Sequence, residues 1–419
     1  MTEIIKARIE AIKKGTLPEG YQKTKAGIMP EDWDGTARAK ELFKSHTDKK
    51  HNGDLEILAS SQECGIVPRS QIGIDIQCSD KGVKGYKKVS KGDFVISLRS
   101  FQGGIEYSEY DGIVSPAYTV LKPVKNISTG FYRNYFKTDY FIDRLNGAVY
   151  GIRDGKQIGY EDFGDMYVHC PPLAEQERIA EIFMQCDKAI DLKQKRIEQE
   201  KKKKAWLYQH IPTGKTRLKG YEAPWVETTI GEQVEYLVGY PFESANFFNS
   251  GIKLLRGSNV KRGNLSWATA ITAYWNEDSS LSDYLLQEGD IVIAMDGAQV
   301  GRSFSRIDNN DLPCYLVQRV ARLRSNINGL IVQWIGGSRF ARHIDQRKTS
   351  TAIPHMTIKD ILSYGISIPT DENEIEQISQ LLNQQDQLID LLEKELSVLR
   401  DRKVSLTQLL LTGIVRTKA

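Results

Sequence analysis

The stretch PPLAEQERIAEIFMQCDKAIDLKQKRIEQEKKKKAWLYQHI, residues 171–211, decides the fold of this chain. Proline is favoured in the first turn of a helix, where its missing N–H costs nothing. Behind the prolines, apolar residues recur at steps of three and four, the spacing that lines one face of a helix and lets two helices pack lengthwise. We therefore predict a long helix here, with a basic flank that includes Lys201 to Lys204.

The same pattern returns 199 residues later, at residues 371–410, with no gap in the alignment. The triplet Ile-Asp-Leu at 190–192 falls on Ile-Asp-Leu at 389–391, and Thr-Gly at 213–214 falls on Thr-Gly at 412–413. Such ungapped register predicts an internal duplication.

Each copy carries its own apolar seam, which we predict to be the packing face of a coiled coil. The seam residues are Ile179, Phe183, Ile190, Ile197 and Leu207 in the first copy, and Ile378, Leu382, Ile389, Leu392, Leu396, Leu399 and Leu406 in the second. Polar residues interrupt both seams, at Lys193, Glu200, Lys204, Gln385 and Lys403. Because such interruptions weaken a self-sufficient zipper, they favour a defined partner helix.

The length and composition of the chain limit the number of domains and the classes of protein to which it can belong. A chain of 419 residues with 40% hydrophobic residues suggests two or three domains, and no apolar run approaches the length of a membrane span. The five cysteines form no Cys-x-x-Cys pair, which fits reduced thiols in the cytoplasm, and we expect no structural metal. The net charge of +3 is small, so basic clusters matter more than the total. The run Lys201 to Lys204 is either a solvated helix face or a contact for phosphate or partner.

The chain begins near the end of one repeat, runs through a full repeat and finishes at the same point of the next. This circular order places a short helix at the N-terminus, able to pack beside the two long ones. The predicted boundaries are 1–15 for that helix, 16–170 for the first globular domain, 171–212 for the first long helix, 213–369 for the second globular domain and 370–419 for the second long helix.

The two globular segments share short β-type patterns. Gly-Asp-Phe-Val-Ile at 92–96 matches Gly-Asp-Ile-Val-Ile at 289–293, in each case a turn that feeds a buried strand and precedes a glycine-containing loop. Aromatic residues at 135–136 and 334, again 199 apart, are typical of the core face of a small helix. The segments are thus related in scaffold and divergent in loops, which suits paired recognition modules.

The sequence contains no complete catalytic motif of the kinds considered below. The sequence Thr-Gly-Lys-Thr at 213–216 ends like a phosphate-binding loop, but Gln209 stands where the first glycine belongs and the preceding residues are helical in pattern. Asp93 and Asp290 begin strands without the Glu-x-Lys that a nuclease would add, so we interpret them as turn residues. No adenine-methylation motif is present. The chain is expected to bind rather than catalyse.

Residues that pair with base edges and phosphates gather in the predicted loops. Arginine reads guanine, and asparagine or glutamine reads adenine, through paired hydrogen bonds, whereas lysine contacts phosphate. The candidates are Arg99, Gln102, Arg153, Lys156 and Gln157 in the first domain, and Arg256, Asn259, Lys261, Arg262, Gln299, Arg302, Gln318 and Arg319 in the second.

With these residues in place, the sequence closely resembles the DNA-specificity subunit of type I restriction-modification enzymes, the HsdS family. The resemblance covers nearly the whole chain. The segments that carry it are GIVSPAYTVLKP at 112–123, CPPLAEQERIAEIF at 170–183, LLRGSNV at 254–260, STAIPHMTIKDI at 350–361 and IPTDENEIEQISQLL at 368–382. The second helix start departs from the first, with Thr370-Asp371 in place of the second proline.

The resemblance implies an α+β fold with two target-recognition domains, separated by two long helices that form an antiparallel coiled coil, in a circular pseudo-twofold repeat. It also implies that each domain reads one half of a bipartite, asymmetric site in double-stranded DNA while the coiled coil sets the spacer. The subunit would be non-catalytic and would carry two adenine methyltransferase subunits, with restriction subunits joining. S-adenosylmethionine, ATP and Mg²⁺ would belong to those partners.

Two other hypotheses stay open. The chain could be a self-contained nuclease or methyltransferase with a divergent active site, which would turn over DNA without added subunits. It could instead be a coiled-coil scaffold that never contacts DNA, in which case it would lack salt-dependent DNA affinity even with a methyltransferase partner present.

Overall fold

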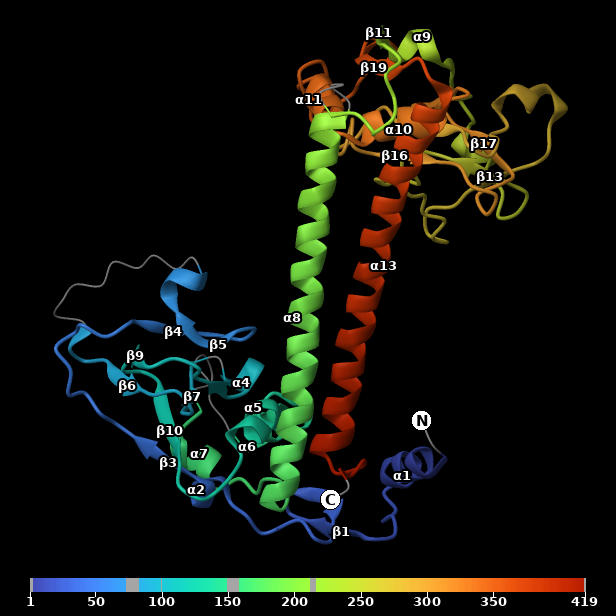
Figure 1. Cartoon of the computed structure of the whole chain (residues 1–419). Coiled ribbons are helices and arrows are strands. Elements are labelled where there is room, and N and C mark those ends of the chain that lie inside the picture. The colour runs from blue at the N-terminus through green and yellow to red at the C-terminus, as the bar shows by residue number, and fades with distance from the viewer. Residues whose placement is uncertain (1–2, 73–82, 99, 149–157, 212–215, 418–419) are drawn as a thin grey trace. The chain divides into compact units, whose positions relative to one another are not determined.

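A computed structural model describes residues 3–72, 83–98, 100–148, 158–211 and 216–417 (Figure 1). The chain divides into two compact units. Unit 1 comprises residues 1–194 and 395–419, and unit 2 comprises residues 195–394. Each long helix therefore contributes one part to each unit, and the units are described separately.

The two long helices are α8 (Leu173–His210) and α13 (Glu372–Leu411), of 38 and 40 residues (Figure 1). Neither contains proline or glycine, so nothing interrupts the hydrogen-bond ladder. Asp371 caps α13, because its carboxylate accepts hydrogen bonds from the backbone N–H groups of Asn373 and Glu374 at 2.9 and 3.3 Å. Gly413, with φ of 73°, follows the end of α13 in the left-handed conformation that a helix stop requires. The helices predicted at 171–211 and 371–410 are confirmed.

The helices pair in opposite directions in both units. The seam residues predicted from the sequence all lie on buried or partly buried faces. Each of the five polar interruptions of the seam contacts the other long helix. In unit 1 these pairs are Lys193 with Glu395 at 2.8 Å and Lys403 with Asp187, and in unit 2 they are Glu200 with Gln385 at 2.8 Å and Lys204 with Asp386. Because numbers rise along one helix as they fall along the other, the pair is antiparallel.

Lobe 1, residues 21–170 of unit 1, is a mixed α/β globule built on a four-stranded antiparallel sheet of order β3-β10-β7-β8. Its strands are β1 (Tyr21–Thr24), β2 (Gly27–Pro30), β3 (Phe43–His46), β4 (Leu58–Ser61), β5 (Gly65–Pro68), β6 (Lys87–Val89), β7 (Phe94–Ile96), β8 (Glu106–Tyr107), β9 (Gly112–Val114) and β10 (Thr119–Pro123). Its helices are α2 (Ala39–Leu42), η1 (Arg69–Ile72), α4 (Ser100–Gly103), α5 (Thr129–Tyr135), α6 (Asp139–Ala148) and α7 (Tyr160–Gly164).

Lobe 2, residues 225–369 of unit 2, repeats this sheet as β12-β18-β15-β16, with the same antiparallel pairing. Its strands are β11 (Trp225–Thr229), β12 (Glu235–Val238), β13 (Ile252–Leu255), β14 (Tyr274–Trp275), β15 (Ile291–Ala294), β16 (Phe304–Arg306), β17 (Cys314–Leu316), β18 (Val320–Arg324) and β19 (Gly365–Pro369). Its helices are α9 (Ile230–Gln233), η3 (Ser244–Asn246), η4 (Ser279–Tyr284), α10 (Asn328–Gly336), α11 (Ser338–Asp345) and α12 (Ile358–Leu362). The common scaffold predicted from the sequence is confirmed.

Each lobe contains a pair of short helices, α5 and α6 in lobe 1 and α10 and α11 in lobe 2. The first helix of each pair contacts a long helix near its start. A Cβ on Gly130 of α5 would lie 2.8 Å from the Cβ of Ala180 on α8, and one on Gly329 of α10 would lie 3.2 Å from that of Ser379 on α13. The apolar cores continue into the long helices. Core 1 includes Phe131, Tyr135, Phe136, Phe141, Ile179, Phe183, Leu410 and Leu411, and core 2 includes Trp334, Ile335, Phe340, Leu207, Ile378 and Leu382. The outermost seam residues therefore also belong to a lobe.

The start and end of the chain meet in unit 1. The Tyr21 hydroxyl donates to the carbonyl of Gly413 at 2.7 Å, and Arg8 donates to the carbonyl of Ile414 at 3.1 Å. Arg8 belongs to the short helix α1 (Glu3–Lys13). The segment that leads into lobe 1 therefore contacts the residues that follow α13. In unit 2 the equivalent connection is made by the chain itself, because residues 217–225 lead from the end of α8 into lobe 2. This is the circular repeat that the sequence predicted.

Candidate nucleic-acid interface

Five of the predicted DNA-contact residues belong to lobe 1. Gln102 lies exposed on α4. Arg99, Arg153, Lys156 and Gln157 lie outside the described residues. The candidate interface is therefore built from lobe 2.

Asn259 must be removed from the candidates. It is fully buried, and its side-chain amide closes the turn that follows β13. The amide oxygen accepts from the backbone N–H of Arg256 at 3.0 Å, and the amide nitrogen donates to the carbonyl of Ser266 at 3.0 Å. Because the amide is used internally and sealed from solvent, Asn259 shapes a loop and cannot reach a base edge in this conformation.

Arg302 and Arg256 are also engaged within the protein. Arg302 forms a paired salt bridge with Asp345 of α11, at 3.1 and 2.5 Å, which holds the loop after β15 against that helix. The Arg302 and Lys348 contacts keep the pKa of the Asp345 carboxyl well below its usual range. Arg256 donates to the carbonyl of Ile271 and lies over the Phe247 ring. Both arginines serve chiefly to stabilise loops.

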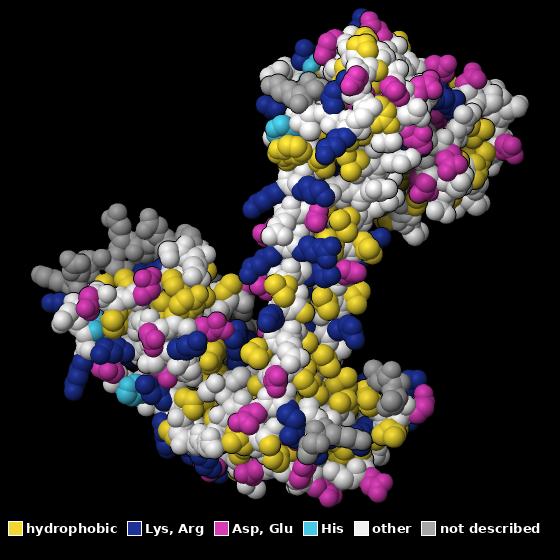
Figure 2. Space-filling model, viewed as in Figure 1, with side chains coloured by type: hydrophobic (Ala, Val, Ile, Leu, Met, Phe, Trp, Pro, Cys, Tyr) yellow, Lys and Arg dark blue, Asp and Glu magenta, His cyan; other side chains and the backbone are white. Residues whose placement is uncertain are grey.

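Five candidates in lobe 2 are exposed. They are Arg319, which is described below, and Lys261, Arg262, Gln299 and Gln318. Arg262 donates to the carbonyl of Gly336 at 3.2 Å, whereas Lys261 extends from the turn that Asn259 closes. Figure 2 shows Lys and Arg side chains on the surface of this lobe and of the long helices. Exposed lysines in such places are suited to phosphate contact, which carries affinity without sequence information.

Arg319 occupies the turn between β17 and β18. Its side chain is 64% exposed, and its guanidinium donates to Asp296 at 3.0 Å. Asp296 follows β15 and was not among the residues singled out from the sequence. An Asp-Gly pair after a strand normally indicates only a turn, so the sequence held no signal that this carboxylate would meet Arg319.

The equivalent turn of lobe 1 carries different residues. Leu121 pairs with Phe94 in lobe 1 as Leu323 pairs with Ile291 in lobe 2, which aligns the two central strands. Counting back from these positions, Ala117 corresponds to Arg319. The shared scaffold therefore presents a methyl group in one lobe and a guanidinium in the other.

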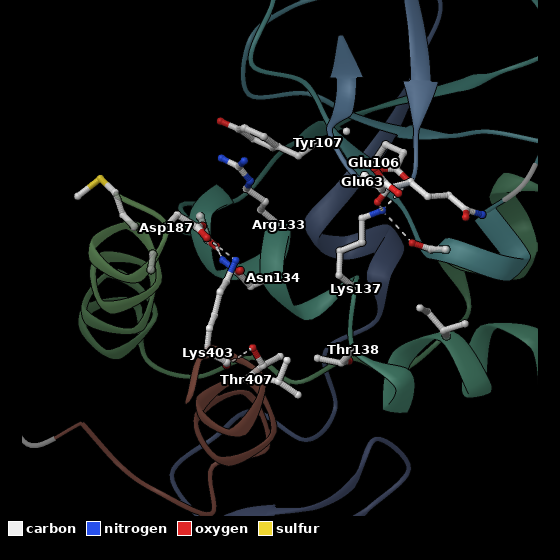
Figure 3. Close-up of a pocket in the computed structure, with 18 of the residues that line it drawn as sticks. Glu63, Glu106, Tyr107, Arg133, Asn134, Lys137, Thr138, Asp187, Lys403 and Thr407 are labelled. Carbon is white, nitrogen blue, oxygen red and sulfur yellow. Dashed lines mark hydrogen bonds and ion pairs between the residues drawn. The ribbon is translucent and has the colours of Figure 1, made fainter. Parts of the chain in front are cut away.

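A groove of about 1340 Å³ lies in unit 1 between lobe 1 and the two long helices (Figure 3). Among the described lining residues three are basic, and each is paired with an acid: Arg133 with Glu109, Lys137 with Glu106, and Lys403 with Asp187. Figure 3 shows Lys403 reaching from α13 toward Asp187 on α8. Glu106 is 1% exposed, and burial raises its pKa although Lys137 opposes that shift. Because the basic lining residues that the structure describes are already paired, none of them is free to hold a phosphate.

Unit 2 has a smaller groove at the corresponding place, of about 480 Å³. Lys204 and Asp386 pair there, at positions 199 residues from Lys403 and Asp187. The Tyr208 hydroxyl also lines this groove and donates to Gln333 of α10, and burial raises the pKa of that phenol. The two junctions between lobe and helix pair are thus built alike.

Each long helix begins on a buried glutamate held by a tryptophan and an arginine. In unit 1, Glu175 accepts from the Trp33 indole at 3.0 Å and from Arg416 at 2.8 and 2.7 Å. Arg416 also contacts Asp32 and has its pKa raised by both acids.

Unit 2 repeats the contact with Glu374, which accepts from Trp225 at 3.3 Å and from Arg217 at 3.2 and 2.6 Å. We call this set of glutamate, tryptophan and arginine the clasp, and neither Glu175 nor Glu374 was among the site residues predicted from the sequence. The 199-residue match of Arg217 with Arg416 was the signal available.

Within the described part of the chain, no three His, Cys, Asp or Glu side chains gather as a set that could hold a metal ion. No helix among the described residues is long and apolar enough to cross a membrane.

A family model described as the type I restriction modification DNA specificity domain matches residues 30–201 and 221–400. The specificity subunit of the type I restriction enzyme EcoAI from Escherichia coli is 28% identical over 278 residues, which are 64% of this chain and 43% of that protein. The specificity subunit of the type I restriction enzyme MjaVIII from Methanocaldococcus jannaschii is 24% identical over 350 residues, covering 79% of this chain and 80% of that protein. The chain thus spans less than half of the first relative and most of the second.

Solved structures show the same fold. The S subunit of the type I restriction-modification system from M. genitalium matches with a TM-score of 0.54 at 13% identity, over 91% of this chain and 96% of that chain. A chain from a structure on complex assembly and conformational transition of the type I R-M system also matches with a TM-score of 0.54, at 14% identity, over 96% of this chain and 100% of that chain.

Proposed function

Because the chain belongs to the family of type I restriction-modification DNA specificity domains, we propose that it is the subunit that gives such a complex its DNA sequence specificity. Lobe 1 and lobe 2 each read one half of a bipartite, asymmetric site through the major groove, and the helix pair sets the spacer between the halves. The observation that carries this proposal is the repeated sheet with unlike exposed turns, Ala117 in one lobe against Arg319 in the other. One scaffold with two different reading surfaces suits an asymmetric site.

The partners in this proposal are double-stranded DNA, two adenine-N6 methyltransferase subunits and restriction subunits. The repeated Ile-Asp-Leu triplet supports two equivalent docking positions on the long helices. Ile190 and Ile389 turn into the seam, whereas Leu192 and Leu391 are 56% and 54% exposed. An apolar side chain so exposed at the same place in both repeats is what two identical partners would cover.

The chain itself is proposed to be non-catalytic and cytoplasmic. S-adenosylmethionine, ATP and Mg²⁺ are assigned to the partner subunits, which also extrude the target adenine from the duplex. The acids at strand starts support this division, because they are used structurally. Asp93 accepts from the backbone N–H of Ser90 at 2.8 Å, and Asp290 forms a paired contact with Arg324 at 2.6 and 2.7 Å.

Methylome sequencing tests the proposal. The chain is coexpressed with the methyltransferase subunits of its own system in a host that lacks adenine methylation, and the methylated adenines are mapped. We expect one bipartite motif that disappears when the chain is omitted. Exchanging residues 16–170 for the first lobe of another specificity subunit should change one half-site and leave the other half-site intact. A motif that is continuous, or one that persists without the chain, contradicts the proposal.

The alternative is a self-contained nuclease or methyltransferase. Incubating the purified chain alone with DNA and S-adenosylmethionine, or with DNA and Mg²⁺, separates it from the first proposal. Methylation or cleavage without added subunits would favour the alternative.

A further inference from the structure

The turn between β17 and β18 holds its exposed residue in an unusual backbone conformation. Arg319 has φ of 67° and is the one residue other than glycine with positive φ in the described part of the chain. Glycine or asparagine is the usual occupant of this left-handed region, because a side chain there crowds the backbone. An arginine in such a backbone conformation points to a role for its side chain.

The surrounding backbone fixes the turn. The N–H of Gln318 donates to the carbonyl of Tyr240 at 2.9 Å, and the N–H of Met295 donates to the carbonyl of Arg319 at 2.9 Å. The backbone of the turn is therefore hydrogen-bonded to a neighbouring segment on each side, which fixes its conformation.

The guanidinium of Arg319 is held by one hydrogen bond, and its other donor groups remain available. Its Nη1 donates to Oδ2 of Asp296 at 3.0 Å, while Nε and Nη2 have no partner among the described residues. These two nitrogens form one edge of the guanidinium, with two parallel N–H donors. Such a fork matches the O6 and N7 acceptors of guanine in the major groove. A tether on Nη1 leaves that edge intact.

Asp296 is itself held in place. Its side chain is 23% exposed, and its backbone forms an antiparallel bridge with His355. A Cβ at Gly257 would lie 3.4 Å from its Oδ1, so the loop that carries Gly257 lies next to the carboxylate. Three loops thus meet around one carboxylate, and that carboxylate sets the direction of Arg319.

The other candidate arginines of lobe 2 lack this combination. Arg302 uses both terminal nitrogens on Asp345, and Arg256 is partly buried with Nη2 on a carbonyl. Arg262 is exposed but has its Nη2 on the carbonyl of Gly336, which occupies a nitrogen shared by both forks. In lobe 1 the equivalent position is Ala117, which has no hydrogen-bonding side chain.

We propose that Arg319 reads a guanine in the half-site recognised by lobe 2, and that Asp296 is the residue that positions it. This inference rests on the proposed function and assigns one base of the target. The equivalent position in lobe 1 is Ala117, so this contact is assigned to the lobe 2 half-site alone.

The test compares four variants by methylome sequencing, each coexpressed with the methyltransferase subunits. Arg319→Gly removes the guanidinium and suits the left-handed backbone, so it does not depend on a strained replacement. We expect the preference for guanine at one position of the lobe 2 half-site to fall by about 5- to 150-fold, the range for loss of one bidentate contact. The lobe 1 half-site and the spacer should be unchanged, which also reports that the variant is folded.

The other three variants separate base reading from charge and from folding. Arg319→Lys keeps the charge but replaces the planar fork with a single ammonium group, so it should weaken the same preference. Asp296→Asn should weaken that preference while the half-site stays recognisable, since the arginine remains but is no longer tethered by a charge. Arg339→Ala removes an exposed arginine from α11 of the same lobe and should leave the motif unchanged.

Two results would overturn the assignment. One is a lobe 2 half-site, identified by the lobe exchange, that contains no guanine in the wild type. The other is a guanine preference that survives Arg319→Gly. Either result leaves the specificity-subunit proposal standing, because the motif remains bipartite. A wild type without any bipartite motif would instead refute the proposed function.

Discussion

At the scale of single residues, His169 joins three segments of unit 1. It is 1% exposed, and its ring nitrogens lie 3.0 Å from the carbonyl oxygens of Ala26 and Leu411. Burial lowers the pKa of His169 to about 4, although the two carbonyls favour the charged ring. The neighbouring Arg144 lowers it further. The imidazole is therefore neutral in the folded protein at physiological pH.

This buried histidine predicts acid destabilisation of unit 1. The unfolded chain binds the proton near pH 6.5, whereas the folded chain binds it only near pH 4. The stabilising contribution is thus complete above pH 6.5 and decreases as the pH falls toward 4, by on the order of 3 kcal/mol in total. Urea unfolding of the wild type and of His169→Gln at pH 7.5 and pH 5 measures it. The difference between the two proteins should shrink at pH 5, and an NMR titration of His169 with a midpoint at or above 6.5 would contradict the assignment.

Residue-level roles were only partly predictable from the sequence. Asn259 and Arg302 belong to residue types that read bases, but hydrogen bonds to Ser266 and Asp345 use them inside the protein. Those partners lie 7 and 43 positions away in the sequence, and no local sequence pattern predicts them. The left-handed backbone of Arg319 could not be predicted from the sequence either, because glycine is the residue that normally marks such a turn.

At the scale of elements, the clasp at the start of α13 predicts a coupled pair. Glu374 is fully buried, so removing Arg217 leaves an uncompensated carboxylate. We expect Arg217→Met to destabilise unit 2 by about 3 kcal/mol, and Arg217→Met with Glu374→Leu to recover most of that loss. Urea unfolding of the wild type, both single variants and the double variant gives the coupling energy. Additive effects of the two single substitutions would show that the residues do not act together.

The long helices were predictable because their signal is periodic and occurs twice. The pairing of their polar residues was not. Lys193 and Gln385 were read as interruptions that favour a partner, and the structure shows Glu395 and Glu200 across the seam from them. Which residues face each other depends on the axial alignment of two antiparallel helices, and a single helix pattern does not contain that alignment.

At the scale of the whole molecule, the same packing device serves both units. Phe183 and Leu410 enter the core of lobe 1, and Leu207 and Leu382 enter that of lobe 2. A lobe therefore cannot move on its helix ends without opening its own core. The repeated scaffold could be predicted because its strand and helix patterns occur twice in the sequence, whereas the strand bounds required the structure. Short strands such as Glu106–Tyr107 lie below the length at which alternation is visible.

Lengthening both long helices should lengthen the spacer between the half-sites. The boundary between the units falls after Gln194 in α8 and after Lys394 in α13, so helix added at both points lengthens the connection and touches neither lobe. Duplicating residues 188–194 and 388–394 adds one heptad to each helix, which preserves the seam because the apolar pattern repeats every seven residues. Seven residues extend a helix by about 10.5 Å, which is about three base pairs at 3.4 Å each.

We therefore expect the methylome of this variant to show both half-sites unchanged and a spacer about three base pairs longer. The matched control duplicates residues 188–194 alone, which shifts one seam against the other and should abolish the motif. An unchanged spacer with both half-sites retained would mean that the helix pair does not set the gap, and the lobes would then have to be placed on DNA by the methyltransferase subunits.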